Sequence, residues 1–516
     1  MNKVKAVLFS KHSAWQKILA VTLIFLIGLG IRLINFSNPP LDIHVWRQLR
    51  SASIARGMYY DMLPGADAGV QSQAHYLGAT FQTLEPTILE RLSAWGYRMI
   101  GQENLAVPRA INVFFWLAGG LFLYDLSRRM TSFWGGLVSL AFYLLLPFGV
   151  SHSRAFIPEP QMIFWVLAAL WALYQWGTTE RWKWALLTGI FGGIAILVKV
   201  FAVYPLVFAV GLFLLSSWGF LKTIRKPQFW VAIGIMALIP GVYYFGILRG
   251  EAGGYIQTWT LPYLHLLIDF NFYLRWLHKL HSLFNLAILL PALLSVILLP
   301  KNSRALVLGL WIGYFLMGCS VPSLIRSHIY YNLILIPIVG LSLSALGDII
   351  FEKLNRQPVY WRLAALAVIG VMIGETAYQA RKELVDVDYH AEPAYWETLG
   401  KQLPTDGKII GLSEDYNTRI QYYGWRFIAP YPYSFDQEMA NLAGSGFDVR
   451  AANLDYFLDK TAGYEYFLIT MFSEFEAQPY LKTILMDHYP ILQQDERMML
   501  FDLRHLLSQP GEAPVN

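Results

Sequence analysis

Long apolar runs separated by short polar connections dominate the first 380 residues of the chain. A bilayer core about 30 Å thick needs roughly 20 apolar residues per helix. About eleven such runs occur, centred near residues 27, 115, 141, 168, 192, 208, 238, 290, 312, 338 and 370. The pattern predicts a polytopic α-helical membrane protein with about 11 transmembrane helices over residues 1–380.

The apolar stretch from Trp184 to Ser217 is interpreted as two helices that are broken at Lys199. With this break and a cytoplasmic N-terminus, lysines and arginines fall in every inner connection, as the positive-inside rule requires. The alternative is one continuous run in which Lys199 snorkels to the interface. That alternative inverts every later loop, so we predict the break, with the polar motifs on the outer side.

Residues 38–106 form an unusually long outward loop. Within it, residues 43–58 and 87–100 have the periodicity of helices. The first of them carries Arg47, Gln48, Arg50 and Arg56 opposite an imperfect apolar face. Basic amphipathic helices lie in the headgroup plane, so we expect juxtamembrane helices here.

The chain becomes ordinary and polar beyond about Arg381. Short strand-like runs occur at 408–412, 466–470 and 498–503, with helical segments between them. Residues 381–516 are therefore predicted to form a small extracytoplasmic α/β domain.

Composition agrees with a membrane location. Hydrophobic residues make up 56% of the 516 residues and charged residues 15%, with a mean hydropathy of +0.41. The net charge of +5 gives no support to a nucleic-acid partner. We expect a multi-pass protein of a bacterial inner (plasma) membrane, with membrane lipids as partners.

Two acids stand at helix boundaries on the predicted outer side. Asp42 follows the first apolar run in Asn38-Pro-Pro-Leu-Asp42, and Glu159 closes the turn that begins at Ser151. Asp42 also suits the N-cap of the next helix. Charges at membrane depth are usually paired or functional, so the two acids are candidate catalytic residues, as a base and its helper. Whether they hold a divalent metal ion stays open, and no other cofactor is indicated.

Several cations on the same side are suited to a lipid-borne phosphate. Lys199 stands at the outer end of an apolar run, and Arg154 precedes Glu159 by five positions. Arg326, His328 and Tyr331 stand together before a helix, where an aromatic belt is the alternative. No Walker-type loop or dinucleotide fingerprint occurs, which argues against a soluble nucleotide donor.

Four motifs in this order resemble the GT-C glycosyltransferases of family 39, which include protein O-mannosyltransferases and the lipid A aminoarabinose transferase. They are Pro40-Leu-Asp42, then Glu85-Pro-Thr-Ile-Leu-Glu-Arg91 with the run from Ile100 to Arg109, then Ser153-Arg-Ala-Phe-Ile-Pro-Glu159, and His328-Ile-Tyr-Tyr331. The resemblance covers roughly the first 340 residues.

The resemblance implies roles for individual residues. Asp42 matches the catalytic aspartate of the family, Glu159 its second acidic position, and Lys199 a lysine before the sixth helix. His328 with Tyr331 matches the segment near the donor phosphate. The chain departs from its relatives at His44, at Glu85-Pro and at Glu159, where many relatives have aspartate. His44, Arg47 and Glu85 complete the predicted substrate-binding residues.

The function implied by the resemblance is transfer of a sugar from a polyprenyl-phosphate carrier, such as undecaprenyl phosphate, to a lipid, glycan or protein acceptor. We expect inversion at the anomeric carbon, with Asp42 as general base. Three alternatives remain at this stage: a flippase of lipid-linked sugars, a non-catalytic scaffold, and another GT-C branch such as an oligosaccharide transferase or ligase.

Overall fold

The computed structural model describes residues 14–82, 85–247, 256–444 and 454–507. The chain divides into two compact units. The first, here called the helical unit, comprises residues 1–37, 83–89 and 106–387. The second, called the sheet unit, comprises residues 38–82, 90–105 and 388–516. The structure thus groups most of the long loop with the C-terminal sheet, and the predicted boundary at residue 381 falls inside a helix.

Each predicted apolar run is helical in the helical unit. The helices are α1 (Ala14–Arg32), α5 (Ala106–Met130), α6 (Phe133–Leu145), α8 (Glu159–Thr179), α9 (Trp182–Val198), α10 (Val203–Trp218), α12 (Pro227–Gly241), α15 (Leu286–Ser295), α16 (Lys301–Ser320), α18 (Leu335–Asn355) and α19 (Val359–Val385). Within the described residues, seven spans are long and apolar enough to cross a membrane, or eight if one bent pair is counted. The chain is an integral membrane protein.

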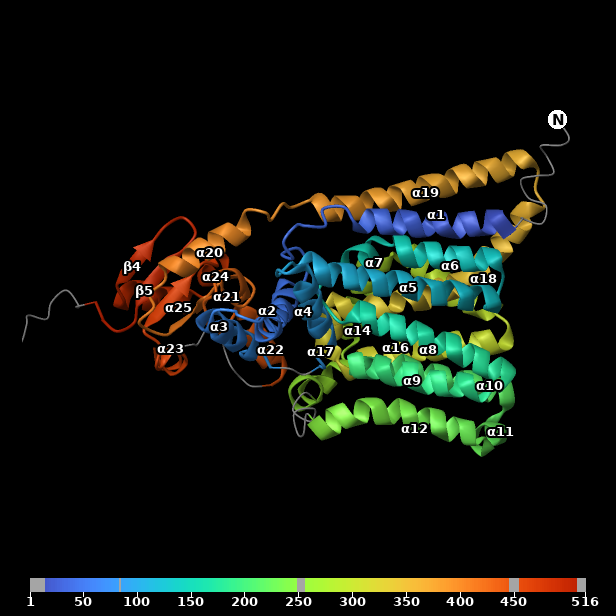
Figure 1. The fold of residues 1–516 in the computed structure, drawn as a ribbon, viewed down its shortest axis with the longest axis horizontal. Helices are drawn as coiled ribbons and strands as arrows, with labels where there is room; N and C mark the ends of the chain where they lie inside the picture. The colour runs from blue at the N-terminus through green and yellow to red at the C-terminus, as the bar shows by residue number, and fades with distance from the viewer. Residues whose placement is uncertain (1–13, 83–84, 248–255, 445–453, 508–516) are drawn as a thin grey trace, which may run out of the picture. The chain divides into compact units, whose positions relative to one another are not determined.

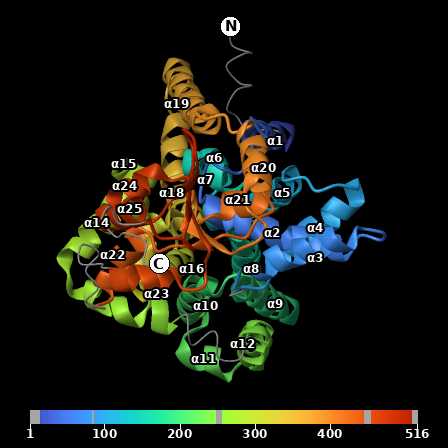
Figure 2. The same cartoon turned by 90° about the vertical axis from the view of Figure 1, so that its left-hand side faces the viewer.

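The long helices of the helical unit run side by side (Figure 1). In the view turned by 90°, α1 and α19 again lie on one side of this unit and α12 on the other (Figure 2). Close packing of α10 and α16 depends on Gly309 and Gly313. A Cβ added at Gly309 would meet the carbonyl oxygen of Phe208 at 2.4 Å, and one added at Gly313 would meet Pro205 at 2.5 Å. Glycines four apart allow two helix backbones to approach closely in a membrane.

Shorter elements connect the long helices. They are α7 (Pro147–His152), η1 (Val200–Ala202), α11 (Phe220–Arg225), η2 (Val242–Ile247), η3 (Leu261–Ile268), α14 (Phe270–Phe284), η4 (Val296–Leu298), α17 (Pro322–Ser327) and η5 (Ile329–Ile334). The segments 270–284 and 286–298 meet at a bend of 98°. The predicted break at Lys199 is confirmed, because α9 ends at Val198 and η1 precedes α10.

The sheet unit contains a five-stranded mixed sheet in the order β2-β1-β3-β5-β4. Its strands are β1 (Ile409–Leu412), β2 (Ala429–Pro430), β3 (Tyr466–Ile469), β4 (Ile491–Gln494) and β5 (Met499–Asp502). Strand β1 pairs in parallel with β2 and β3, whereas β5 is antiparallel to β3 and β4. The three predicted strands are confirmed; β2 and β4 were not predicted.

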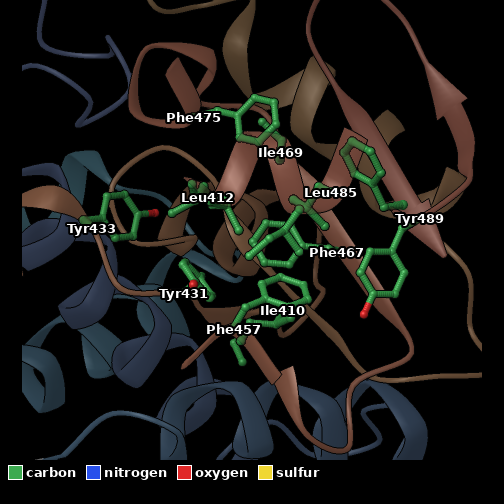
Figure 3. Close-up of a cluster of buried hydrophobic side chains, with 14 residues drawn as sticks. Ile410, Leu412, Tyr431, Tyr433, Phe457, Phe467, Ile469, Phe475, Leu485 and Tyr489 are labelled. Carbon is green, nitrogen blue, oxygen red and sulfur yellow. The ribbon is translucent and has the colours of Figure 1, made fainter. Parts of the chain in front are cut away.

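Strands β1 and β3 are buried on both faces, and their alternate side chains point to opposite sides of the sheet. Ile410, Leu412, Phe467 and Ile469 form one core with aromatic side chains such as Phe457 (Figure 3). On the other face, Ile409, Tyr466 and Leu468 pack with Trp396 and Ile420. The helices of this domain are α20 (Glu392–Gln402), α21 (Thr418–Tyr423), α22 (Ser434–Leu442), α23 (Leu454–Thr461), α24 (Phe472–Ala477) and α25 (Pro479–His488).

The long loop forms three helices, α2 (Val45–Asp61), α3 (Ala68–Ala79) and α4 (Ile88–Ile100). The predicted helices correspond to α2 and α4. However, α2 does not expose the basic face expected of a helix on a membrane surface, because Arg50 and Arg56 are buried. Instead α2 packs on α3 and α21. By contrast, α4 exposes Trp95 and Met99, as an interfacial helix would.

Candidate active site

Glu159 is positioned by the start of helix α8. The helix begins at Glu159 itself, after Pro158 and before Pro160, and proline suits the first turn of a helix. The side chain is buried, with 1% of its residue surface exposed. The N-terminal end of a helix carries a partial positive charge that stabilises a carboxylate. The fold therefore places an acid at this buried end of α8.

Lys199 lies in the break between α9 and η1, with an extended backbone (φ −155°, ψ 119°). It is 2% exposed. A lysine that snorkels to the interface keeps its ammonium group in water, and the burial of Lys199 contradicts that alternative.

An ionic cluster forms around Lys199. Its ammonium group makes a salt bridge to Oε1 of Glu159 and lies 3.5 Å from Oε1 of Glu85. The other oxygen of Glu159, Oε2, is buried and has no hydrogen-bond partner among the described residues. Two carboxylates thus face one ammonium group.

Two tyrosines of η5 cover this cluster. The ring centroids of Tyr330 and Tyr331 each lie 4.8 Å from Nζ of Lys199, within the range of a cation–π contact. Phe201 of η1 supports the ring of Tyr331, with centroids 5.2 Å apart. The sequence predicted Tyr331 but missed Tyr330, although the adjacent pair of tyrosines was a visible signal.

His328 lies beside the same tyrosines. Its ring centroid is 5.5 Å from that of Tyr330 and 6.4 Å from that of Tyr331. Its Nδ1 is 2.7 Å from the hydroxyl of Ser327, and the residue is half-buried. Arg326, also half-buried, precedes it at the end of α17. Of the predicted residues, Glu85, Glu159, Lys199, His328 and Tyr331 are therefore brought together.

Arg154 is occupied differently. Its Nη1 donates to the carbonyl oxygens of Arg32 (3.1 Å) and Ile34 (2.5 Å), and its Nη2 donates to that of Asn35 (2.7 Å). The side chain therefore binds the backbone where α1 ends. Nothing in these contacts places it on a phosphate, and that role remains a prediction.

Arg32 is a buried cation that the sequence did not single out. Its Nε donates to the hydroxyl of Ser153 at 2.7 Å, and its Nη1 donates to the carbonyl oxygens of Gly28 and Leu144 at 2.8 Å each. An arginine at the end of an apolar run was the only signal. Together with Arg154, it anchors the segment that leaves α1.

Asp42 belongs to the sheet unit and is exposed. Its Oδ1 accepts hydrogen bonds from the backbone N–H of Ile43 at 2.9 Å and from Nε2 of Gln48 at 3.3 Å. The N-cap of α2 is His44, in the left-handed region (φ 44°, ψ 49°), and no side chain caps the helix. The capping alternative for Asp42 is therefore wrong. Arg47 is half-buried within the first turn of α2.

No group of three or more histidine, cysteine, aspartate or glutamate side chains suitable for a metal ion occurs in the part of the chain that the structure describes.

Residues 88–244 match the family model of dolichyl-phosphate-mannose-protein mannosyltransferases. This segment contains both Glu159 and Lys199. No curated protein matches the sequence.

Two of the solved structures with a similar fold hold a lipid phosphate. One is the oligosaccharyltransferase AglB of Archaeoglobus fulgidus, in complex with an inhibitory peptide and a dolichol-phosphate. Its TM-score is 0.58 at 13% identity, with 98% of this chain and 76% of that chain covered. The other is ArnT of Cupriavidus metallidurans bound to undecaprenyl phosphate. Its TM-score is 0.54 at 13% identity, with 93% and 97% covered. The predicted fold class, a polytopic helical membrane protein of GT-C type with a small C-terminal α/β domain, is confirmed, and the resemblance to family 39 is supported over residues 88–244.

Proposed function

We propose that this chain, which has the fold of the GT-C glycosyltransferases and a segment of the mannosyltransferase type, transfers a sugar from a polyprenyl-phosphate carrier to an acceptor. One observation carries the proposal. A buried Lys199, held between Glu159 and Glu85 beneath two tyrosine rings, lies in the segment that matches the family model. A lipid-borne donor suits this location, because its tail stays in the bilayer while its head group reaches the helix ends.

The reaction is a single displacement that inverts the anomeric carbon. The acceptor hydroxyl oxygen forms a bond to that carbon while Asp42 takes the hydroxyl proton. The bond between the carbon and the phosphate oxygen breaks, and its electron pair leaves with the polyprenyl phosphate. A positioned base contributes typically 10²–10⁴-fold to such a step.

In this proposal the Lys199 cluster binds both parts of the donor head group, the phosphate and the sugar. An ammonium group has three N–H donors, so Lys199 can exchange a carboxylate contact for a phosphate oxygen as the donor binds. In a site of low dielectric, this contact stabilises the charge on the leaving phosphate. His328 adds a second donor when protonated.

The carboxylates serve the sugar. Glu159 has a buried oxygen without a partner among the described residues, and Glu85 lies on the other side of the ammonium group. Carboxylate oxygens accept hydrogen bonds from sugar hydroxyls. Arg154 and His44 remain candidates for substrate contacts.

The proposed location is a bacterial plasma membrane, with the N-terminus in the cytoplasm and residues 388–516 outside. The positive-inside distribution supports this orientation. The acceptor is a lipid, a glycan or a protein at the outer face. One named neighbour binds an inhibitory peptide and a dolichol-phosphate, and the other binds undecaprenyl phosphate, so peptide, lipid and glycan acceptors are all to be assayed.

The decisive experiment uses the purified full-length protein with labelled polyprenyl-phosphate sugars and candidate acceptors. Release of polyprenyl phosphate, coupled to label on the acceptor, supports the proposal. Movement of intact donor across a vesicle membrane without cleavage identifies a flippase instead. A requirement for an oligosaccharide donor identifies the oligosaccharide-transferring branch.

A further inference from the structure

Three buried side chains from three elements form a chain of hydrogen bonds in the helical unit. Nε1 of Trp276 in α14 donates to the hydroxyl of Tyr314 in α16 at 3.2 Å. That hydroxyl donates to Oδ1 of Asn332 in η5 at 2.6 Å. All three residues are less than 5% exposed. Buried polar groups are costly unless they are paired, so this chain of hydrogen bonds specifies one arrangement of α14, α16 and η5.

Asn332, the last residue of this chain of hydrogen bonds, closes the turn that carries the two tyrosines. Nδ2 of Asn332 donates to the carbonyl oxygen of Ile329 at 3.3 Å. Tyr330 and Tyr331 stand between these two residues, and both rings lie over Lys199. The conformation of Asn332 therefore affects where the tyrosine rings lie.

Trp276, the first residue of this chain of hydrogen bonds, is held in place by packing. A Cβ added at Gly318 would meet the ring of Trp276 at 2.2 Å, so the indole fits against α16 only because this position is glycine. The ring of Phe315 stacks on Trp276 with centroids 5.9 Å apart and an interplanar angle of 11°. The indole is thus held where its hydrogen bond to Tyr314 can form.

We propose that Tyr314 is a positioning residue for the binding of the polyprenyl phosphate. It acts through Asn332 and η5, and it sets the distance between the two tyrosine rings and Lys199. The proposal rests on the proposed function of that cluster. Displacements of about 1 Å in a binding site can cost as much as 10²-fold, so a loosened η5 has a measurable effect.

The test is Tyr314→Phe in the full-length protein, with binding of undecaprenyl phosphate as the first readout. We expect the dissociation constant and the KM for the donor to rise about tenfold, with kcat and the KM for the acceptor changed less than about twofold. Tyr143→Phe is the matched control. It removes another buried tyrosine hydroxyl of the helical unit, one that donates to the carbonyl oxygen of Trp116 at 3.1 Å.

Equal affinity of Tyr314→Phe and the wild type for undecaprenyl phosphate would overturn the inference, as would an equal loss in Tyr143→Phe. If Tyr314→Phe does not fold, Trp276→Phe interrupts the same chain one bond earlier and is expected to weaken binding in the same direction. A wild type that binds undecaprenyl phosphate but transfers no sugar refutes the proposed function, while the binding comparison still decides the inference. A wild type that does not bind it refutes both.

Discussion

Lys199 of the helical unit and Arg56 of the sheet unit are both buried cations, and they differ in the number of carboxylates that face each of them. Nε of Arg56 lies 2.9 Å from Oε2 of Glu103 and Nη2 lies 3.0 Å from Oε1, a bidentate pair. Nη1 donates to the carbonyl oxygen of Tyr422 at 2.5 Å. The rings of Tyr422 and Trp425 lie 3.8 and 4.3 Å from the guanidinium carbon. One cation thus pairs with one carboxylate, and two aromatic rings pack against the guanidinium group.

The ionisation of this second cluster follows from the same contacts. Burial by itself lowers the pKa of Arg56, but the Glu103 carboxylate beside it raises that pKa above its ordinary value. Burial also raises the pKa of the Tyr422 hydroxyl, which donates to Glu103. The cluster joins α2 to the C-terminal segment with balanced charge, as a structural ion pair does.

Around Lys199 the balance differs. Two carboxylates share one ammonium group, and one oxygen of Glu159 is left for another donor. Clusters of interacting ionisable groups occur at functional sites, and structural ion-pair networks contain them as well. The proposed function places donor binding at the Lys199 cluster and predicts a structural role for the Arg56 cluster.

Asp42 belongs to the sheet unit. A loss of transfer in Asp42→Asn would therefore show that the helical unit does not hold all of the catalytic residues. We expect transfer to fall by about 10²–10⁴-fold with normal folding, since the base is lost. The measurement is the steady-state rate of polyprenyl phosphate release. Asp67→Asn, at the exposed N-cap of α3, is the matched control with an unchanged rate. Near-normal turnover by Asp42→Asn would remove Asp42 from the mechanism.

Lys199→Met tests the helical side of the comparison. Transfer should fall by at least about 10²-fold, as when one charge-stabilising donor is removed from an active site. Stability should fall too, because Glu159 loses its buried partner. Adding Glu159→Gln should restore the melting temperature without restoring transfer. Recovery of both together would place the Lys199 cluster with the structural pairs.

Arg56→Met tests the other side. Leaving Glu103 buried without its partner should cost about 3–5 kcal/mol of unfolding free energy, with transfer per folded molecule unchanged. The double variant with Glu103→Leu should recover most of the stability, because an apolar pair of similar size often replaces a buried ion pair. Urea unfolding and activity normalised to folded protein give the two readouts. A specific loss of turnover in the double variant contradicts the structural role.

Glu90→Gln sharpens the comparison with a third buried group and has the smallest expected effect. Burial raises the pKa of Glu90, despite a 2.7 Å hydrogen bond from the Ser51 hydroxyl. Because the folded pKa lies above the unfolded one, stability that is present at low pH is lost as the pH rises from about 4.3 through the folded value. Glu90→Gln should reduce this pH-dependent change in the free energy of unfolding by on the order of 1 kcal/mol.

The matched control for Glu90→Gln is Glu438→Gln, at an exposed position on α22. Melting temperatures of both variants and the wild type at pH 4.5 and pH 7 provide the comparison. A wild-type slope retained in Glu90→Gln assigns the pH dependence to another group.

Local sequence patterns predicted most of the fold. All the apolar runs became helices and the break at Lys199 was found, because hydropathy and charge act on neighbouring residues. The strands at 409–412, 466–469 and 499–502 were predicted for the same reason. Strand β2 has only two residues and β4 is mostly exposed and partly polar, so neither has a local signature. Helix α2 was found, but its burial depends on α3 and α21.

The sequence by itself determined the membrane helices, the main strands, the family resemblance and the types of residue available for chemistry. It singled out Lys199 at the break of an apolar run and placed Arg56 on an amphipathic helix, but it could not show that both are buried or which carboxylates face each of them. Their difference depends on partners that are distant in the chain: Glu159 lies 40 positions from Lys199 and Glu103 lies 47 from Arg56. Charge balance is a property of three-dimensional neighbours, and only the tertiary structure decided it.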